Sequence, residues 1–168
     1  MSILTTSRLE IIELSISDTS FIFELLNTPS WKRFIGDRGI KTQEDAKNYI
    51  VNKFIPAYST WWFGFRLVRL KENKTPIGIC GLVKRDALEH IDIGFAFLPQ
   101  YEGKGYGYES ASAVMQHATT ELGIKTIAGI TDSKNKSSIA LLEKLGLHFQ
   151  KMILLPGETE EIMLFVTQ

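Results

Sequence analysis

A glycine-rich stretch joins a predicted strand to a predicted helix and holds Gly103, Gly105 and Gly107 in alternation. Glycine adopts positive φ angles and lets a ligand approach the backbone closely. The start of a helix leaves several N–H groups without partners and carries a partial positive charge. Lys104 adds a formal positive charge to the same turn. This combination predicts a site for an anion, most naturally a diphosphate.

The glycine spacing also has other interpretations. A tight strand-to-helix turn without a ligand accounts for the spacing as well and stays open on spacing alone. The dinucleotide-binding fingerprint needs G-x-G-x-x-G inside a parallel unit, whereas these glycines read G-x-G-x-G and follow an antiparallel meander. The phosphate loop of the NTPases is excluded because no G-K-[ST] follows a glycine at a four-residue gap.

The apolar pattern predicts the elements that position this turn. Alternating and branched segments predict seven strands, over residues 8–14, 61–70, 77–84, 90–98, 126–131, 147–155 and 161–166. Helical spacing predicts four helices: after the caps Ser17 and Asp18, from the Thr42–Asp45 capping box to Pro56, from the glycine turn to about Leu122, and over 137–145. Residues 61–98 should form an antiparallel meander because their connections are too short for a parallel crossover. We expect one mixed α/β domain over residues 1–168.

The composition is that of an ordinary globular chain. Lysine plus arginine number 19 and aspartate plus glutamate number 19, so the net charge is zero. Such a balance argues against a chain that coats nucleic acid or an anionic membrane. Cys80 is the only cysteine, which excludes an internal disulfide and a cysteine metal site. The first ten residues lack the apolar stretch of a signal peptide and no apolar run is long enough to cross a bilayer, so we expect a cytoplasmic protein.

Two motifs together resemble a known superfamily. Gln100-x-x-Gly103-x-Gly105 is similar to the Q/R-x-x-G-x-G/A motif of the GCN5-related N-acetyltransferases (GNAT). Asn135-x-x-Ser138, followed by residues 141–146, resembles the second cofactor motif of that superfamily. Residues 6–11 and 103–111 resemble the branch that contains the RimJ/RimL-like ribosomal-protein N-terminal acetyltransferases. The resemblance runs from about residue 4 to the end of the chain.

The resemblance implies a GNAT-type fold and acetyl-CoA as the acyl donor, with no metal. The implied sheet is mixed and mostly antiparallel, has about seven strands and about four flanking helices, and opens between its fourth and fifth strands. The backbone N–H of Phe95 is expected to polarise the thioester carbonyl and to stabilise the oxyanion. Donor contacts are implied at Phe97, Gln100, Glu102, Gly103, Lys104, Gly105, Tyr106, Gly107, Asn135 and Ser138.

The residues implied for proton transfer depart from the superfamily pattern. In many relatives a tyrosine that acts as the general acid stands where this chain has Leu142. The nearest hydroxyl that could take this role is that of Ser138. Several relatives carry a catalytic glutamate where this chain has Ile91. Glu89 shares the predicted face of that strand position and is the candidate base, acting through water. Asp92 matches an acidic position common in the RimJ/RimL-like branch, but strand alternation points it to the other face.

The expected acceptor is a primary amine, either a protein N-terminal α-amine or a small-molecule amine, that attacks acetyl-CoA directly in a ternary complex. The first two helices usually build the acceptor wall in this superfamily, which makes Trp31 and Phe34 candidate contacts and Trp61 and Trp62 further ones. We expect no nucleic acid or membrane partner and a monomer or homodimer. Two alternatives stay open: a CoA-binding sensor or interaction module that has lost transfer activity, and a nucleotide-binding oxidoreductase.

Overall fold

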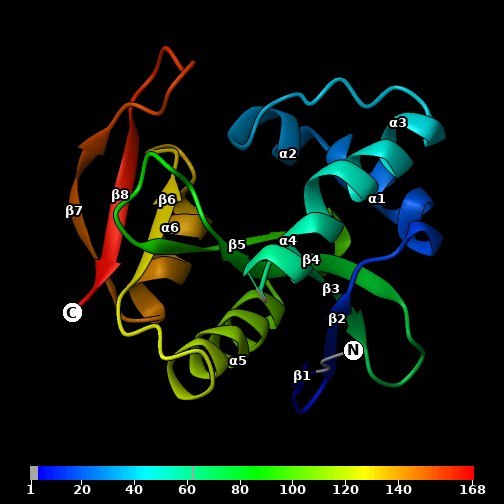
Figure 1. The fold of residues 1–168 in the computed structure, drawn as a ribbon, viewed down its shortest axis with the longest axis horizontal. Coiled ribbons are helices and arrows are strands. Elements are labelled where there is room, and N and C mark those ends of the chain that lie inside the picture. Colours follow the sequence, from blue (N-terminus) through cyan, green and yellow to red (C-terminus); the bar gives the residue numbers. More distant parts are fainter. Residues whose placement is uncertain (1–3, 62) are drawn as a thin grey trace.

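An eight-stranded sheet in the order β1-β2-β3-β4-β5-β6-β8-β7 forms the frame of the molecule (Figure 1). The computed structural model describes residues 4–61 and 63–168. Neighbouring strands are antiparallel except β5 and β6, which are parallel. The strands are β1 (Leu4–Thr5), β2 (Leu9–Glu13), β3 (Phe65–Leu70), β4 (Pro76–Val83), β5 (Ile91–Phe97), β6 (Ile127–Thr131), β7 (Leu147–Ile153) and β8 (Ile162–Thr167). The predicted mixed, mostly antiparallel sheet is confirmed.

The sheet opens between β5 and β6. These strands share two register pairs, Ile91 with Ile127 and Asp92 with Ala128, although β5 runs on to Phe97. Beyond the second pair, β5 follows β4 and β6 follows β8. The predicted opening between two parallel strands is therefore confirmed. It lies between the fifth and sixth strands because β1, with two residues, is too short to show alternation and was not predicted.

Residues 4–61 and 63–168 form six α-helices that flank the sheet, where four were predicted. They are α1 (Thr19–Leu26), α2 (Pro29–Phe34), α3 (Gln43–Tyr49), α4 (Ile55–Trp61), α5 (Tyr106–Thr120) and α6 (Lys136–Lys144). One face of the sheet packs against α5 and α6 through Ala111, Val114 and Leu142. On the other face, Leu67 and Ile79 pack against α1, α2 and α3. The opening of the sheet therefore has a different helical layer on each side (Figure 1).

The prediction that Pro56 ends the second helix was wrong. The chain runs from α3 through a π-helical turn, Ile50–Phe54, into α4 and stays helical to Trp61. Proline is tolerated in the first turn of a helical segment because no N–H is needed there, and Pro56 is the second residue of α4. Strand β3 therefore begins at Phe65 rather than at Trp61. Trp62, which the strand prediction included, lies outside the described residues.

The predicted capping box of the second helix is confirmed, and Cys80 lies in the core. Thr42 and Asp45 form a capping box in which the Asp45 N–H donates to Thr42 Oγ1 over 3.1 Å and the Thr42 N–H donates to Asp45 Oδ2 over 2.9 Å. Cys80 is buried in the core cluster that the sheet shares with α5. Burial raises the pKa of its thiol to about 12, so Cys80 is a core side chain rather than a reactive one.

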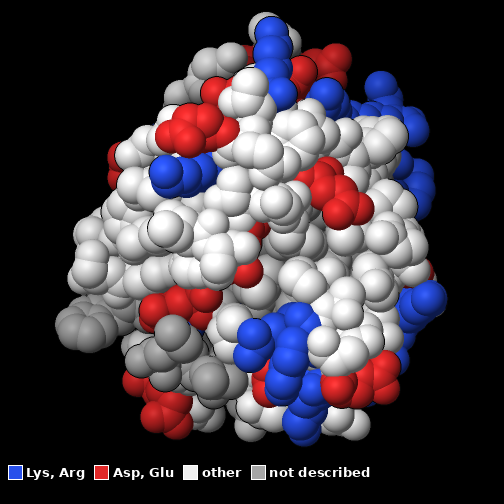
Figure 2. Space-filling model, turned by 90° about the vertical axis from the view of Figure 1, so that its right-hand side faces the viewer, with Lys and Arg blue, Asp and Glu red and all other residues white. Residues whose placement is uncertain are grey.

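Charges on the molecular surface are mixed in sign. Figure 2 shows basic and acidic side chains interspersed over the face that it presents. Among residues 4–61 and 63–168, no helix is long and apolar enough to cross a membrane. Nor do His, Cys, Asp and Glu side chains of these residues form a group of three or more that could hold a metal ion.

Candidate active site

A turn with two left-handed glycines follows β5 and leads into α5. Gly103 has a φ of 72° and Gly105 a φ of 84°, values that favour glycine over other residues. Gly105 is the N-cap residue of α5 and supplies no side-chain cap. Within the described part of the chain, no backbone N–H from residue 103 to residue 108 donates a hydrogen bond. This row of free N–H groups at a helix N-terminus suits a polyanion.

Three residues predicted in this turn have further or different roles. A Cβ at Gly107 would lie 2.9 Å from Leu141 Cδ2, so the absence of a side chain there allows α5 to approach α6. The Glu102 N–H donates to the Pro99 carbonyl oxygen over 3.2 Å and is therefore not part of the free row. Gln100 lies exposed in a short 3-10 turn, Pro99–Tyr101, that precedes the glycines.

The segment before β2 holds this turn in place. Arg8 donates from Nε to Glu109 Oε2 over 2.7 Å and from its backbone N–H to Glu109 Oε1 over 2.8 Å. The Thr6 hydroxyl donates to the same Oε1 over 2.6 Å. Arg8 Nη1 donates to the Lys104 carbonyl oxygen over 3.0 Å, and the guanidinium lies 4.3 Å from the centre of the Tyr106 ring. We call these contacts of Thr6 and Arg8 with the start of α5 the Arg8 clamp.

The Arg8 clamp also sets charge at the turn. Burial opposes the ionisation of Glu109, but hydrogen bonds from Thr6 and Arg8 outweigh it and lower the pKa of the carboxyl. The carboxylate therefore anchors Arg8, whose Nη2 lies 3.2 Å from the position of a Cβ at Gly105. The sequence did not predict this pairing, although both residues lie in segments that carry the family resemblance. The two are 101 positions apart, and their spacing alone gives no signal of contact.

Two backbone N–H groups of β5 face the opening of the sheet. The Leu98 N–H donates to the Ile77 carbonyl oxygen of β4 over 2.9 Å. Hydrogen bonding alternates along an antiparallel pair, so the N–H groups of Phe95 and Phe97 point away from β4 and toward β6. The register pairs of β5 with β6 end before these residues. The structure therefore directs into the opening the two strand donors that the sequence singled out.

The N-terminus of α6 borders the opening on the β6 side. Asn135 is the N-cap residue, and its Oδ1 accepts hydrogen bonds from the Ser138 N–H and the Ser137 hydroxyl, each over 3.2 Å. Among the described residues, the Asn135 side-chain nitrogen and the Ser138 hydroxyl have no hydrogen-bond partner. Asn135 thus caps the helix with its side-chain oxygen, while its side-chain nitrogen has no partner among the described residues.

A buried carboxylate lies on β5 where the opening begins. Asp92 is 1% exposed, and its two carboxylate oxygens accept from Arg85 Nε over 3.2 and 3.4 Å. Burial raises the pKa of Asp92 to about 6, although Arg85 lowers it in part. Gly94 lies two residues after Asp92 on β5 and therefore faces the same side of the sheet. A Cβ at Gly94 would contact the Phe65 ring, and Phe65 packs against the core cluster of α1–α3. Asp92 therefore points to the face that these helices cover, with a pKa suited to accepting a proton.

Glu89, the base predicted from the sequence, lies apart from this arrangement. It belongs to the bend before β5, its side chain is 87% exposed, and its carboxylate is 3.9 Å from His90 Nε2. Strand alternation does not extend to a residue outside the strand, which is why the parity argument misplaced it. The structure leaves Glu89 in solvent and makes Asp92 the buried carboxylate of the region. Burial, which parity does not reveal, is the signal that distinguishes them.

The two predicted acceptor contacts lie in α2 in different surroundings. Trp31 is 5% exposed in the core cluster of α1–α3, and its backbone N–H donates to the hydroxyl of Thr28, the N-cap residue of α2, over 3.3 Å. The Trp31 indole nitrogen is buried without a hydrogen-bond partner among the described residues. Phe34 is half-buried at the end of α2, 4.8 Å from the Arg33 guanidinium. The structure thus gives Trp31 a core position and leaves Phe34 partly accessible.

A sheet that opens between parallel strands, beside a helix start with free N–H groups, is the arrangement that the resemblance of the two motifs implied. The chain matches the family model of the acetyltransferase (GNAT) domain over residues 8–148. It therefore belongs to the GNAT acetyltransferase family, and the family predicted from the motifs is confirmed.

Known relatives agree with this assignment. The uncharacterized N-acetyltransferase YnaD of Bacillus subtilis is 28% identical over 145 residues, which cover 86% of this chain and 81% of YnaD. A crystal structure of an acetyltransferase from Agrobacterium tumefaciens matches with a TM-score of 0.83 and 20% identity, over 100% of this chain and 95% of that one. The structure of the ribosomal L7/L12 α-N-protein acetyltransferase RimL in complex with coenzyme A matches with a TM-score of 0.84 and 14% identity. The match covers 98% of this chain and 97% of RimL. At these identities the two structures establish the fold.

Proposed function

We propose that this protein is an acetyl-CoA-dependent N-acetyltransferase that acts on a primary amine by direct transfer in a ternary complex. The observation that carries the proposal is the row of free N–H groups over residues 103–108, placed where the sheet opens. In a family of acetyltransferases, the diphosphate of CoA is the polyanion that fits such a row. The acceptor is a protein N-terminal α-amine or a small-molecule amine.

The donor contacts follow from the geometry of the opening. The N–H groups of residues 103–107 hold the diphosphate, and Lys104 and Arg8 place positive charge around it. The Phe97 N–H binds the pantetheine arm from the β5 side of the opening. The Asn135 side-chain nitrogen binds the same arm from the β6 side. The residues present therefore fit acetyl-CoA as the donor substrate.

Asp92 is the base of this proposal. The acceptor enters as an ammonium ion, and the Asp92 carboxylate takes one of its protons through water while Arg85 holds the carboxylate in place. The neutral amine then attacks the thioester carbon, and the Phe95 N–H stabilises the oxyanion that forms. The C–S bond breaks, its electron pair stays on sulfur, and the nitrogen releases a second proton that protonates the thiolate.

Protonation of the leaving thiolate does not depend on a tyrosine. Leu142 occupies the position at which many relatives carry one, and it is 1% exposed and packed against Gly129. A free thiol has a pKa of about 8.5, so the thiolate leaves without a dedicated acid. Ser138, with its unpartnered hydroxyl at the start of α6, is the nearest group for relaying the proton.

Thiol release from acetyl-CoA tests the proposal. We expect turnover with at least one primary amine from a panel of peptides and small amines, and acetyl-CoA binding that is measurable by calorimetry. Turnover with no acceptor, combined with no binding of acetyl-CoA, would overturn it.

A second candidate function is a CoA-binding sensor or interaction module without transfer activity. Leu142 and Ile91, which stand where relatives carry an acid and a base, favour this candidate. Acetyl-CoA binding without transfer to any acceptor would support it. The third alternative, a nucleotide-binding oxidoreductase, disagrees with the acetyltransferase family to which the chain belongs.

Removal of the Arg8 clamp should weaken donor binding more than it slows chemistry. Arg8→Met removes the guanidinium donors to Glu109 and to the Lys104 carbonyl oxygen. We expect the KM for acetyl-CoA to rise about 10- to 100-fold, as for the loss of one or two charge-assisted hydrogen bonds, with kcat within about threefold of the unaltered protein. Steady-state kinetics of both variants check this, with Arg38→Met, an exposed arginine of the α2–α3 connection, as the control. Equal changes in the two variants would contradict the role of the clamp.

A further inference from the structure

We infer that the acceptor is a small amine that carries a carboxylate and places its apolar body in a pocket beside α4; this inference rests on the proposed function. The pocket lies between α4, the start of β3 and the end of β4, and has a volume of about 270 Å³. Residues of its lining include Lys53, Phe54, Trp61, Phe65, Val83 and Lys84. We call it the α4 pocket. Its volume lies just below the roughly 300–1,000 Å³ of sites for drug-sized ligands, so it suits a molecule of about one amino acid.

The α4 pocket borders the strand on which the proposed chemistry takes place. Phe65 is both a wall of the pocket and the cover of Gly94, since a Cβ at Gly94 would lie 2.6 Å from Phe65 Cζ. Gly94 directly precedes Phe95, whose N–H points into the opening between β5 and β6. Val83, another wall residue, is the register partner of Asp92. A ligand in the pocket is therefore one strand away from both the proposed oxyanion donor and the proposed base.

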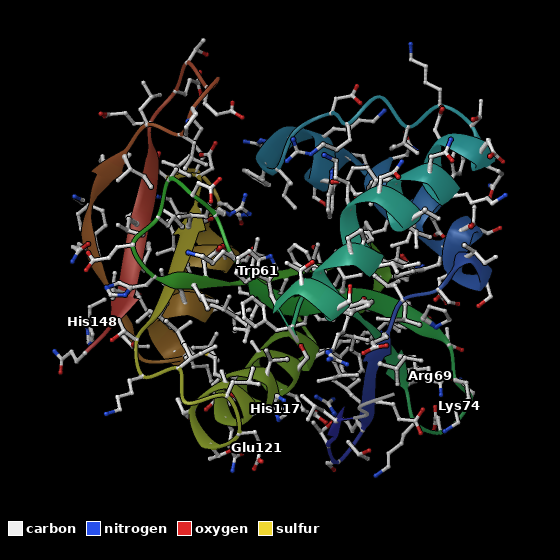
Figure 3. The ribbon with its side chains drawn as sticks, in the orientation of Figure 1. Trp61, Arg69, Lys74, His117, Glu121 and His148 are labelled. Carbon is white, nitrogen blue, oxygen red and sulfur yellow. The ribbon has the colours of Figure 1, made fainter. Side chains whose placement is uncertain are left out.

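Aromatic side chains form the walls of the α4 pocket. The rings of Phe54 and Phe65 meet edge to face with their centres 5.9 Å apart. Trp61 is 45% exposed, and Figure 3 shows it at the C-terminal end of α4 near the middle of the molecule. An exposed tryptophan beside the buried ring of Phe54 and the half-buried ring of Phe65 offers apolar surface to a ligand.

The charges of the α4 pocket select for an anionic group on that ligand. Lys53 and Lys84 are the charged side chains among its described lining residues, and both are exposed. Neither forms an ion pair with a described residue. Two unpaired ammonium groups attract a carboxylate. They repel a polyamine, which carries positive charge along its length.

Calorimetric titration of the full-length protein in the presence of CoA tests the inference. The probes are L-phenylalanine and 2-phenylethylamine, which share an apolar body and an amine and differ by the carboxylate. We expect L-phenylalanine to bind at least about tenfold tighter, the effect of one charge-assisted contact. The double variant Lys53→Met/Lys84→Met should lose this preference and bind 2-phenylethylamine as before. Lys151→Met, an exposed lysine on β7, is the matched control and should change neither affinity.

Equal affinities for the two probes, a preference that survives the double variant, or tighter binding of spermidine would each overturn the inference. Loss of both probes in the double variant would indicate a folding defect, and the single variants Lys53→Met and Lys84→Met then decide by the same criterion. Binding is measured without transfer. If the proposed function is wrong, no thiol is released from acetyl-CoA, although L-phenylalanine still binds tighter than 2-phenylethylamine. If this inference is wrong, the two probes bind with equal affinity, whatever the rate of acetyl transfer.

Discussion

Replacement of Gly105 by glutamate will abolish acetyl-CoA binding while the protein stays folded. Gly105 has a φ of 84°, and its absent side chain leaves the row of N–H groups open to a diphosphate. A carboxylate at this position repels the phosphates and competes for the same donors. We expect affinity to fall at least about a hundredfold, because a like charge in a binding site costs several kcal/mol. Calorimetry with acetyl-CoA measures the fall.

The control for backbone strain is Gly157→Glu. Gly157 has a φ of 82° and open space around its Cβ position, so it takes the same residue in the same conformation on the β7–β8 connection. Both variants should lose about 1–2 kcal/mol of stability from the left-handed backbone, and only Gly105→Glu should lose the ligand. Retained affinity in Gly105→Glu would show that the glycines form a tight turn without a ligand.

Asp92→Asn should reduce kcat about 10²- to 10⁴-fold, the usual contribution of a general base. The KM for acetyl-CoA should change little, because Asp92 faces the acceptor side of the sheet. In the unaltered protein, kcat/KM should rise with pH and level off above about 6, since burial raises the pKa of Asp92 to about 6 and the protonated carboxyl cannot accept a proton. Initial rates from pH 5 to pH 8 measure both effects.

Glu89→Gln is the matched control, because it changes the exposed carboxylate that precedes β5. Its rate should stay within about twofold, as for a surface substitution; a large loss there with an active Asp92→Asn variant would reinstate Glu89 as the base. Unfolding does not account for the predicted loss. The pKa of Asp92 has an ordinary value of 3.8 and is raised to about 6 in the folded protein. At pH values between these two, the folded protein binds more protons at Asp92 than the unfolded chain does. The free energy of unfolding therefore falls as the pH rises through this range and Asp92 ionises. Asp92→Asn removes that penalty and should melt no earlier at pH 7.

Local patterns were sufficient to predict the glycine turn and the elements on either side of it. The glycines, the helix that follows Gly105 and the alternation of β5 all involve residues within a few positions of one another. Phe95 and Phe97 were singled out by the family resemblance, and the parity of β5 explains why their N–H groups face away from β4. Asn135 was singled out by the second motif of that resemblance, and its place at the start of α6 is one where a capping residue is expected.

Features that depend on distant contacts were missed. The pairing of Arg8 with Glu109 joins residues 101 positions apart. The burial of Asp92 depends on Arg85 and on the chain folded over it, whereas its position in the sequence shows a polar residue on a strand. The helix continues past Pro56 because of a π-helical turn, and the spacing of apolar residues does not predict such a turn. Each of these features depends on contacts in the folded protein, which the pattern of neighbouring residues does not describe.

β5 and β6 are joined at one end by two register pairs, and their remaining N–H groups face a gap. In the proposed complex, a pantetheine arm that bonds to Phe97 on one side and to Asn135 on the other would take the place of a missing strand. The donor is then a structural element of the sheet as well as a reactant. Amide hydrogen exchange at Phe95 and Phe97 should slow when acetyl-CoA binds, and the melting temperature should increase with its concentration. Product release removes this element and should return amide exchange at Phe95 and Phe97 to its faster rate.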